Sequence, residues 1–84
     1  MNNVIMRKIA VTTVYTPLVA SKLIGSVTIS TPPTNSGQVQ FRGDDGLDVP
    51  WVPGEWHEFV AVNLADIKVK GTPGDVVTVV GGTW

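Results

Sequence analysis

The sequence predicts an all-β protein: a single small β-sandwich, jelly-roll-like or a Greek-key barrel, of about six to eight short strands. Apolar and polar residues alternate along short runs, which is the pattern of half-buried strands. Clusters of Pro, Gly and Asn separate these runs at roughly the eight- to twelve-residue spacing that is typical of sandwiches. No segment keeps a helical period over ten residues. We expect one β domain over residues 1–84, with an N-terminal arm (1–7), a sandwich (8–80) and a C-terminal tail (81–84).

The first predicted strand spans residues 8–15, which alternate in polarity and are rich in β-branched residues. Thr16-Pro17 interrupts it. The second predicted strand spans residues 22–30, and its Gly25 marks either a β-bulge or a close approach of two backbones. A turn over residues 31–37 follows, because two prolines stop the strand while Asn and Gly supply turn conformations.

The second half of the chain continues the same pattern. Residues 38–42 alternate, with the apolar Val39 and Phe41 directed inward, and residues 43–55 form a long connection. Further strands are predicted over residues 56–64, 65–71 and 75–82. The face of the 56–64 strand that we expect to point inward carries Trp56, Val60, Val62 and Leu64, with Glu58 as the exception.

The last predicted strand is apolar on both of its faces. Val76 and Val80 lie on one face, and Val77 and Val79 lie on the other. A strand of this kind is covered on both sides. In so short a chain we expect the second cover to be another subunit, which makes Val77 and Val79 candidate interface residues.

The composition also favours association. Charged residues make up 15% of the chain and hydrophobic residues 43%, and the mean hydropathy is +0.21. Soluble domains average about 25% charged residues, so this chain has more apolar surface than one small core hides. We interpret it as a subunit that self-associates or sits on a larger assembly; a monomer with few surface charges is the alternative.

Charge and hydropathy argue against two classes of partner. The net charge is −1, and among the six cationic residues only Arg7 and Lys8 are adjacent. Nucleic-acid backbones are bound by clustered Lys and Arg, so we expect no nucleic-acid partner. No apolar run approaches the ~18 residues of a membrane span, so we expect no membrane partner either.

The sequence offers no set of residues for a cofactor, a metal or catalysis. The chain has no cysteine and one histidine, His57. Asp44, Asp45 and Asp48 lack the register of a calcium loop, and we favour a solvated acidic turn. His57 and its neighbour Glu58 point to opposite faces of a strand, so they do not form an acid–base pair. We expect no enzyme; a contact between Asp48 and His57 in a pocket would reopen that interpretation.

The tryptophans are the remaining candidate site residues. Trp51 and Trp56 flank a Val-Pro-Gly-Glu segment, and Trp84 is the last residue. Prolines at positions 50 and 53 hold the chain extended around Trp51. A rigid segment that bears tryptophan is typical of an interface hot spot, so Trp51, Trp56 and Trp84 are candidate interface residues. The alternative is a sugar platform built from Trp51 and Trp56.

Read from end to end, the chain resembles a recurrent class of small structural proteins of tailed bacteriophage virions. The segments that carry the resemblance, in order, are TPLVASKL, VTIS, PPTNSGQVQFRG, VPWVPGEW, NLADIKVKG and PGDVVTVV. The similarity covers roughly Val11 to Val80. The tryptophan content is higher than this class leads us to expect.

The resemblance implies a compact β-sandwich, commonly a homotrimer, on the outer surface of a virion and without catalytic residues. We therefore expect a capsid decoration (cement) protein, made in the host cytoplasm, whose partners are its own copies and the major capsid protein or another virion protein. The first alternative is a fibre-base, spike or tail-associated structural module. The second, from another class, is a carbohydrate-binding module that uses Trp51 and Trp56.

Overall fold

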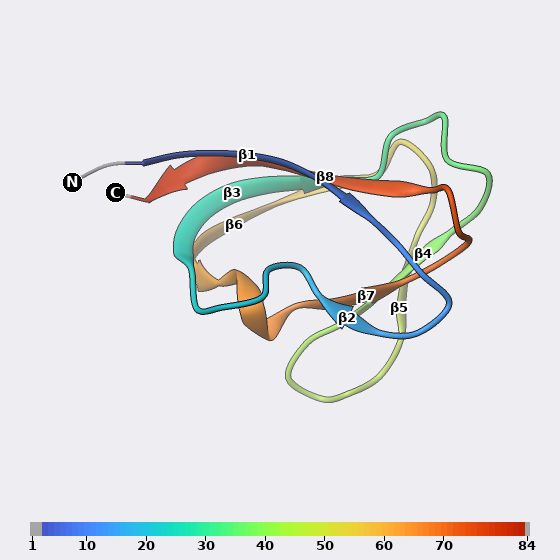
Figure 1. Ribbon diagram of the computed structural model, residues 1–84, viewed down its shortest axis with the longest axis horizontal. Coiled ribbons are helices and arrows are strands. Elements are labelled where there is room, and N and C mark those ends of the chain that lie inside the picture. Colours follow the sequence, from blue (N-terminus) through green and yellow to red (C-terminus); the bar gives the residue numbers. More distant parts are fainter. Residues whose placement is uncertain (1–2, 84) are drawn as a thin grey trace.

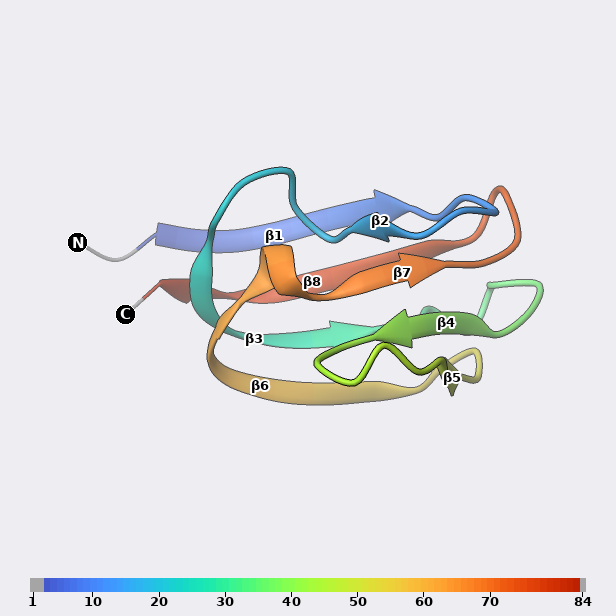
Figure 2. The same cartoon turned by 90° about the horizontal axis from the view of Figure 1, so that it is seen from below.

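Two four-stranded antiparallel sheets form a β-sandwich in the computed structural model, which describes residues 3–83 (Figures 1 and 2). The elements are β1 (Asn3–Ala10), β2 (Thr16–Pro17), β3 (Ile24–Ser30), β4 (Val39–Arg42), β5 (Val49–Trp51), β6 (Trp56–Asn63), the 3-10 helix η1 (Leu64–Asp66), β7 (Lys68–Lys70) and β8 (Val76–Thr83). The prediction of a small all-β sandwich is confirmed.

The strand order decides between the topologies that the sequence left open. One sheet has the order β1-β8-β3-β6 and the other β2-β7-β4-β5. Strands therefore pair as β1 with β8, β2 with β7, β3 with β6 and β4 with β5. The chain is in effect one long hairpin folded over on itself, which is the arrangement of a jelly roll.

The core lies between the two sheets and is made of alternating residues from both. In β3, Val27 and Ile29 are buried, and in β4, Val39 and Phe41 are buried, as the alternation predicts. Over residues 3–83, the buried apolar residues are Ile5, Val11, Leu18, Val19, Val27, Ile29, Val39, Phe41, Trp51, Leu64, Val69, Val77 and Val79. Burial on this scale is what holds so small a domain together in the absence of disulfides.

The segments expected as a terminal arm and a terminal tail lie within strands over their described residues. Asn3 to Arg7 belong to β1, and Gly81 to Thr83 belong to β8, where Asn3 pairs with Thr83. These two ends run side by side (Figure 1). β1 also ends at Ala10 and not at residue 15. The Val11 N–H still bonds to the carbonyl of Asp75, but the carbonyl of Thr12 accepts from the N–H of Gly71, which follows β7 of the other sheet. The ends of β1 and β8 are set by the strands with which they pair, and a single sequence does not show which strands pair.

The predicted inner face of β6 is wrong at its start. Trp56 and Val60 are exposed, whereas Phe59 packs against the core. A β-bulge separates the two halves of the strand: Val27 pairs with Phe59 but Gly25 pairs with Val62, so β6 has one extra residue. Ala61, in the bulge, has φ +52°, and its N–H donates to Ser26 Oγ. The extra residue reverses the alternation, so that Phe59 and Val62 both lie on the inner side.

The two faces of β8 are not covered in the way that the sequence suggested. Val77 and Val79 are fully buried in the core of this chain, so their role as interface residues is corrected. The opposite face carries Val80, which is 51% exposed. The face of β8 that this chain leaves uncovered is therefore the outer one.

Glycine permits the closest approach between β3 and β8. A Cβ atom at Gly81 would overlap the carbonyl oxygen of Ser26 and lie 2.6 Å from the Cα of Val27. A Cβ at Gly25 would lie 2.9 Å from the carbonyl oxygen of Gly82. Gly25 also adjoins the bulge, so both features predicted for it are present.

A buried carboxylate ties the loop after β3 to the start of β8. Asp75 is 5% exposed and accepts hydrogen bonds from the backbone N–H of Ser36 (2.8 Å) and of Gly37 (3.2 Å). In the same loop, the side chain of Asn35 both donates to and accepts from the backbone of Val76. Asn35 thereby continues the pairing with β8 beyond the last residue of β3. The loop is fixed by these polar contacts.

Acid should weaken this link. The hydrogen bond from the Ser36 N–H, reinforced by the Ser36 hydroxyl and the Gly37 N–H, lowers the pKa of Asp75 below its ordinary value of 3.8. A carboxyl with a lowered pKa in the folded state stabilises the fold above its unfolded pKa, and this stabilisation is lost as the pH falls through the folded value. We expect the midpoint of urea unfolding to fall as the pH drops below about 4, and to fall less steeply for Asp75→Asn than for the parent chain. Equal slopes for both proteins would contradict this role of Asp75.

Candidate functional site

The stretch from Phe41 to Phe59, which contains most of the candidate site residues, spans both sheets. It begins at the end of β4, crosses an acidic loop to the short strand β5, and turns over residues 52–55 into β6. β5 and β6 belong to different sheets. Residues that are neighbours in the sequence of this stretch therefore direct their side chains to different parts of the molecule.

Trp51 lies in the core and not on the surface. Its indole is 5% exposed and stacks on Phe41, with ring centroids 3.8 Å apart. His57 approaches it edge-on at 4.7 Å, and Phe59 lies parallel at 6.4 Å. Trp51 closes the end of the sandwich where β5 meets the start of β6. The interpretation of Trp51 as an interface residue is therefore corrected.

Trp56 is 58% exposed and points away from the core. Because Trp51 is buried and lies in the other sheet, the two indoles do not form a joint platform for a sugar. Among the predicted interface residues that the structure describes, Trp56 is the accessible one. Trp84 lies outside the described residues.

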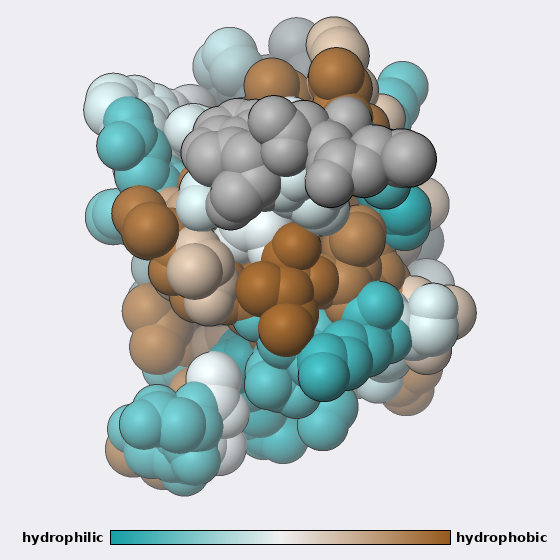
Figure 3. Space-filling view, turned by 90° about the vertical axis from the view of Figure 1, so that its left-hand side faces the viewer, coloured by the Kyte–Doolittle hydropathy of each residue, from teal (hydrophilic) through white to brown (hydrophobic). Residues whose placement is uncertain are grey.

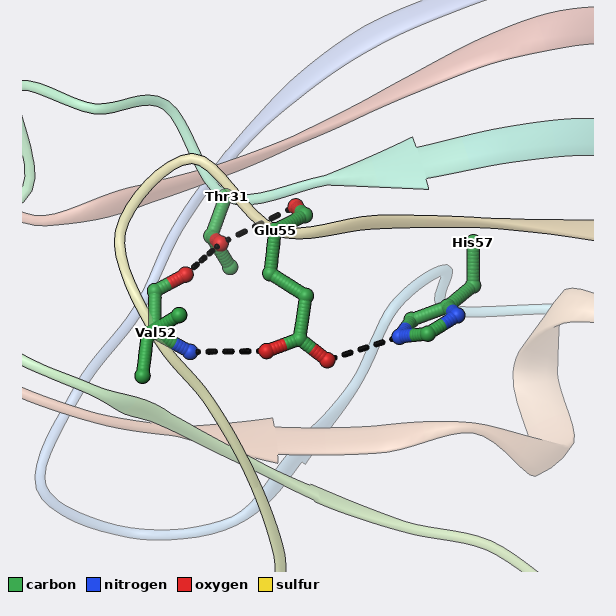
Figure 4. Close-up of polar contacts among 4 residues, drawn as sticks. All are labelled: Thr31, Val52, Glu55 and His57. Carbon is green, nitrogen blue, oxygen red and sulfur yellow. Dashed lines mark hydrogen bonds and ion pairs between the residues drawn. The ribbon is translucent and has the colours of Figure 1, made fainter.

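In the turn between β5 and β6, the side chain of Glu55 contacts His57 (Figure 4). The N–H of Glu55 bonds to the carbonyl of Val52, and Gly54 has φ +87°, as a type II Pro-Gly turn requires. The Glu55 carboxylate accepts from the Val52 N–H at 3.0 Å and contacts His57 Nε2 at 2.7 Å. The contact with His57 has the largest effect, the hydrogen bond from Val52 the next largest, and both lower the pKa of Glu55. His57 is therefore paired locally, and not with Asp48.

The acidic loop is a structured turn. Asp45 Oδ1 accepts from the Leu47 N–H at 3.0 Å, as an Asx turn does. Asp48 accepts from the Tyr15 hydroxyl at 2.5 Å and from Arg42 Nε at 2.9 Å, and these contacts lower the pKa of Asp48. Within residues 3–83, no three His, Cys, Asp or Glu side chains gather as a metal site would require.

A groove opens between β6 and the loop after β4. It has a volume of about 520 Å³, and Phe59, Val62 and Ile67 form its apolar walls, with Asp44 and Asp66 also lining it. A smaller hollow of about 180 Å³ shares Gly43, Phe59 and Ile67 with it and extends to Trp51. The groove exists because the bulge turns both Phe59 and Val62 toward the inside. It holds no nucleophile with an adjacent base.

The outer side of the β1-β8-β3-β6 sheet forms a second accessible region, which we call the apolar face. Its exposed apolar residues are Val4, Met6, Ile24, Trp56, Val60 and Val80. Cross-strand pairing sets Met6 beside Val80, and Val80 beside Thr28. Small hydroxyl residues occupy its centre, and Val60 and Val80 line a shallow hollow of about 280 Å³. The end of the molecule where the termini lie also shows hydrophobic surface (Figure 3).

The outer side of the β2-β7-β4-β5 sheet differs in charge, and the sequence did not predict this. Arg42 pairs with Lys68 across the strands, and Lys70 follows on the same side of β7. We call this side, with Tyr15 packed on it, the basic face. Half of the six cationic residues of the chain lie here. They are far apart in sequence, so only the pairing of β4 with β7 brings them together.

Comparison with known proteins adds no relative. No protein-family model, curated protein or solved structure matches the chain. Over residues 3–83, no helix has the length and hydropathy needed to cross a membrane.

Proposed function

We propose that this protein is a structural virion protein, a capsid decoration (cement) protein that binds the outer capsid surface as a homotrimer and stabilises the shell. The apolar face carries the proposal. Val4, Met6 and Val80 are each more than half exposed on adjacent strands. A monomeric protein rarely leaves a contiguous group of large apolar side chains open to water, and such a patch marks a surface for protein contacts.

The charge of the apolar face supports the same conclusion. Lys8 and Glu58 are the charged residues on the outward positions of its four strands, and Ser26, Thr28, Ser30 and Thr78 are small and polar. A weakly charged surface loses little hydration energy when a protein partner covers it. The jelly-roll order is also used by many viral capsid proteins, although fold alone does not assign function.

Binding that occurs only on the assembled shell would stabilise it by mass action, because each bound copy favours the intact state over the dissociated one. We therefore expect the protein in hundreds of copies on each particle, as counted by quantitative mass spectrometry of purified virions. Particles without it should release their DNA at a lower temperature. A copy number of a few would instead favour the alternative, a fibre-base, spike or tail-associated module.

A substitution on the apolar face tests the surface itself. Val80→Asp should leave the fold intact, because Val80 is 51% exposed, but should reduce binding to particles that lack the protein by at least about tenfold, since a buried unpaired charge costs more than 1.4 kcal/mol. Val14→Asp is the matched control, because Val14 is 64% exposed in the loop between β1 and β2. Co-sedimentation measures both. Equal binding of the two variants would exclude the apolar face.

A further inference from the structure

We propose that the basic face binds a carboxylate-bearing segment of a protein partner, so that the molecule has a second, charge-selective contact surface on the sheet opposite the apolar face. The residues that would receive the carboxylates are Arg42, Lys68 and Lys70. Tyr15 and Asp48 hold Arg42 in position. This surface is independent of the apolar face, and its test does not depend on the proposed function.

The first observation is an unfavourable pairing. Arg42 and Lys68 are direct cross-strand partners, and Lys70 lies two residues from Lys68 on the same side. Like charges placed directly opposite each other destabilise a sheet. Asp48 is paired with Arg42, but neither Lys68 nor Lys70 forms an ion pair with a carboxylate of residues 3–83. A bound anion would relieve this repulsion.

The second observation is that the site already holds one carboxylate. Asp48 Oδ1 accepts from the Tyr15 hydroxyl and from Arg42 Nε, and Arg42 stacks over the Tyr15 ring at 4.0 Å from its centroid. Lys70 Nζ lies 4.9 Å from the same centroid. The ring is therefore flanked by two cations and holds both near Asp48. This arrangement fixes the direction of the cationic groups before any partner arrives.

Carboxylates fit this face better than a nucleic-acid backbone does. Nucleic-acid binding is stabilised by many phosphate contacts, whereas this face offers three cations, of which Arg42 is already paired with Asp48. The net charge of the chain is −1, and the exposed Asp44 and Asp45 follow β4 directly. These charges repel an anionic partner more strongly the more charges it carries, so a segment with few carboxylates is repelled less than a long polyanion. The partner that fits is a short acidic segment of a protein.

The test is binding of a short poly-glutamate peptide, with a single-stranded DNA oligonucleotide of similar length as the competing probe. We expect poly-glutamate to bind more tightly than the oligonucleotide, and binding to weaken with salt. The double variant Lys68→Gln/Lys70→Gln should bind poly-glutamate about tenfold more weakly, because two exposed ion pairs are lost. The matched control Lys8→Gln/Lys22→Gln removes the same charge elsewhere and should bind as the parent does.

Three results would overturn the proposal. They are no measurable binding of poly-glutamate by the parent chain, equal loss of binding in the two double variants, and tighter binding of the oligonucleotide than of poly-glutamate. Isothermal titration calorimetry at low and moderate salt distinguishes all three. Far-UV circular dichroism of each variant verifies that the sandwich is retained, as we expect for exposed or half-exposed lysines.

Discussion

Trp51→Ala should cost about 3–5 kcal/mol of unfolding free energy, because removing a buried aromatic side chain leaves a cavity that the surrounding core cannot fill. Trp51 is stacked on Phe41 and also contacts His57 and Phe59, so its loss affects both sheets. In a domain of this size that is a large part of the total stability. Urea denaturation followed by far-UV circular dichroism measures the effect without relying on tryptophan fluorescence.

Trp56→Ala is the matched control, since it removes the same side chain from an exposed position of β6. Its effect on the unfolding free energy of the monomer should stay within about 0.5 kcal/mol. The two substitutions thus distinguish a core tryptophan from a surface one. Comparable losses for Trp51→Ala and Trp56→Ala would contradict the assignment of Trp51 to the core.

Gly81→Ala should cost about 3 kcal/mol, although it adds a single methyl group. The new Cβ would overlap the carbonyl oxygen of Ser26 and approach the Cα of Val27, and both of these are backbone atoms of β3. Because β3 is held between β8 and β6, it cannot move away without breaking ladder hydrogen bonds. Thermal and urea unfolding of the variant measure the cost.

Gly43→Ala provides the comparison for this prediction. Nothing lies within 4 Å of a Cβ built at Gly43, and its φ is not in the left-handed region. We expect a change within about 0.5 kcal/mol in either direction. If Gly81→Ala were as mild as Gly43→Ala, the close packing of β3 on β8 would be refuted.

The sequence predicted the strands with the clearest alternation and the best turn signals. Residues of β3 and β4 are buried in the predicted pattern, and the Pro-Pro and Pro-Gly segments form turns. These are local properties, since a two-residue period and a fixed proline φ depend on neighbours in the chain. For the same reason the prediction failed in β6, where a bulge that depends on β3 reversed the faces.

The candidate site was predicted less well than the fold. Polar and aromatic residues that crowd one stretch of sequence suggested a single surface, but alternate strands send Trp51 into the core and Trp56 to the outside. The sequence does not indicate the basic face, because Arg42 and Lys68 are 26 positions apart in it. A cross-strand pair leaves no signal in a single sequence, because charged residues at outward positions of two strands do not show which strands are neighbours.

The sequence by itself determined the fold class. Period-two alternation, regular turn residues and low charge specify a small β-sandwich that has more apolar surface than its core buries. Only the tertiary structure decided which surface that is. Val77 and Val80 belong to the same apolar strand. The β2-β7-β4-β5 sheet nevertheless covers Val77 and leaves Val80 open to water. The physical reason is that alternation marks two faces of a strand, whereas the packing of one sheet on the other decides which face loses contact with water.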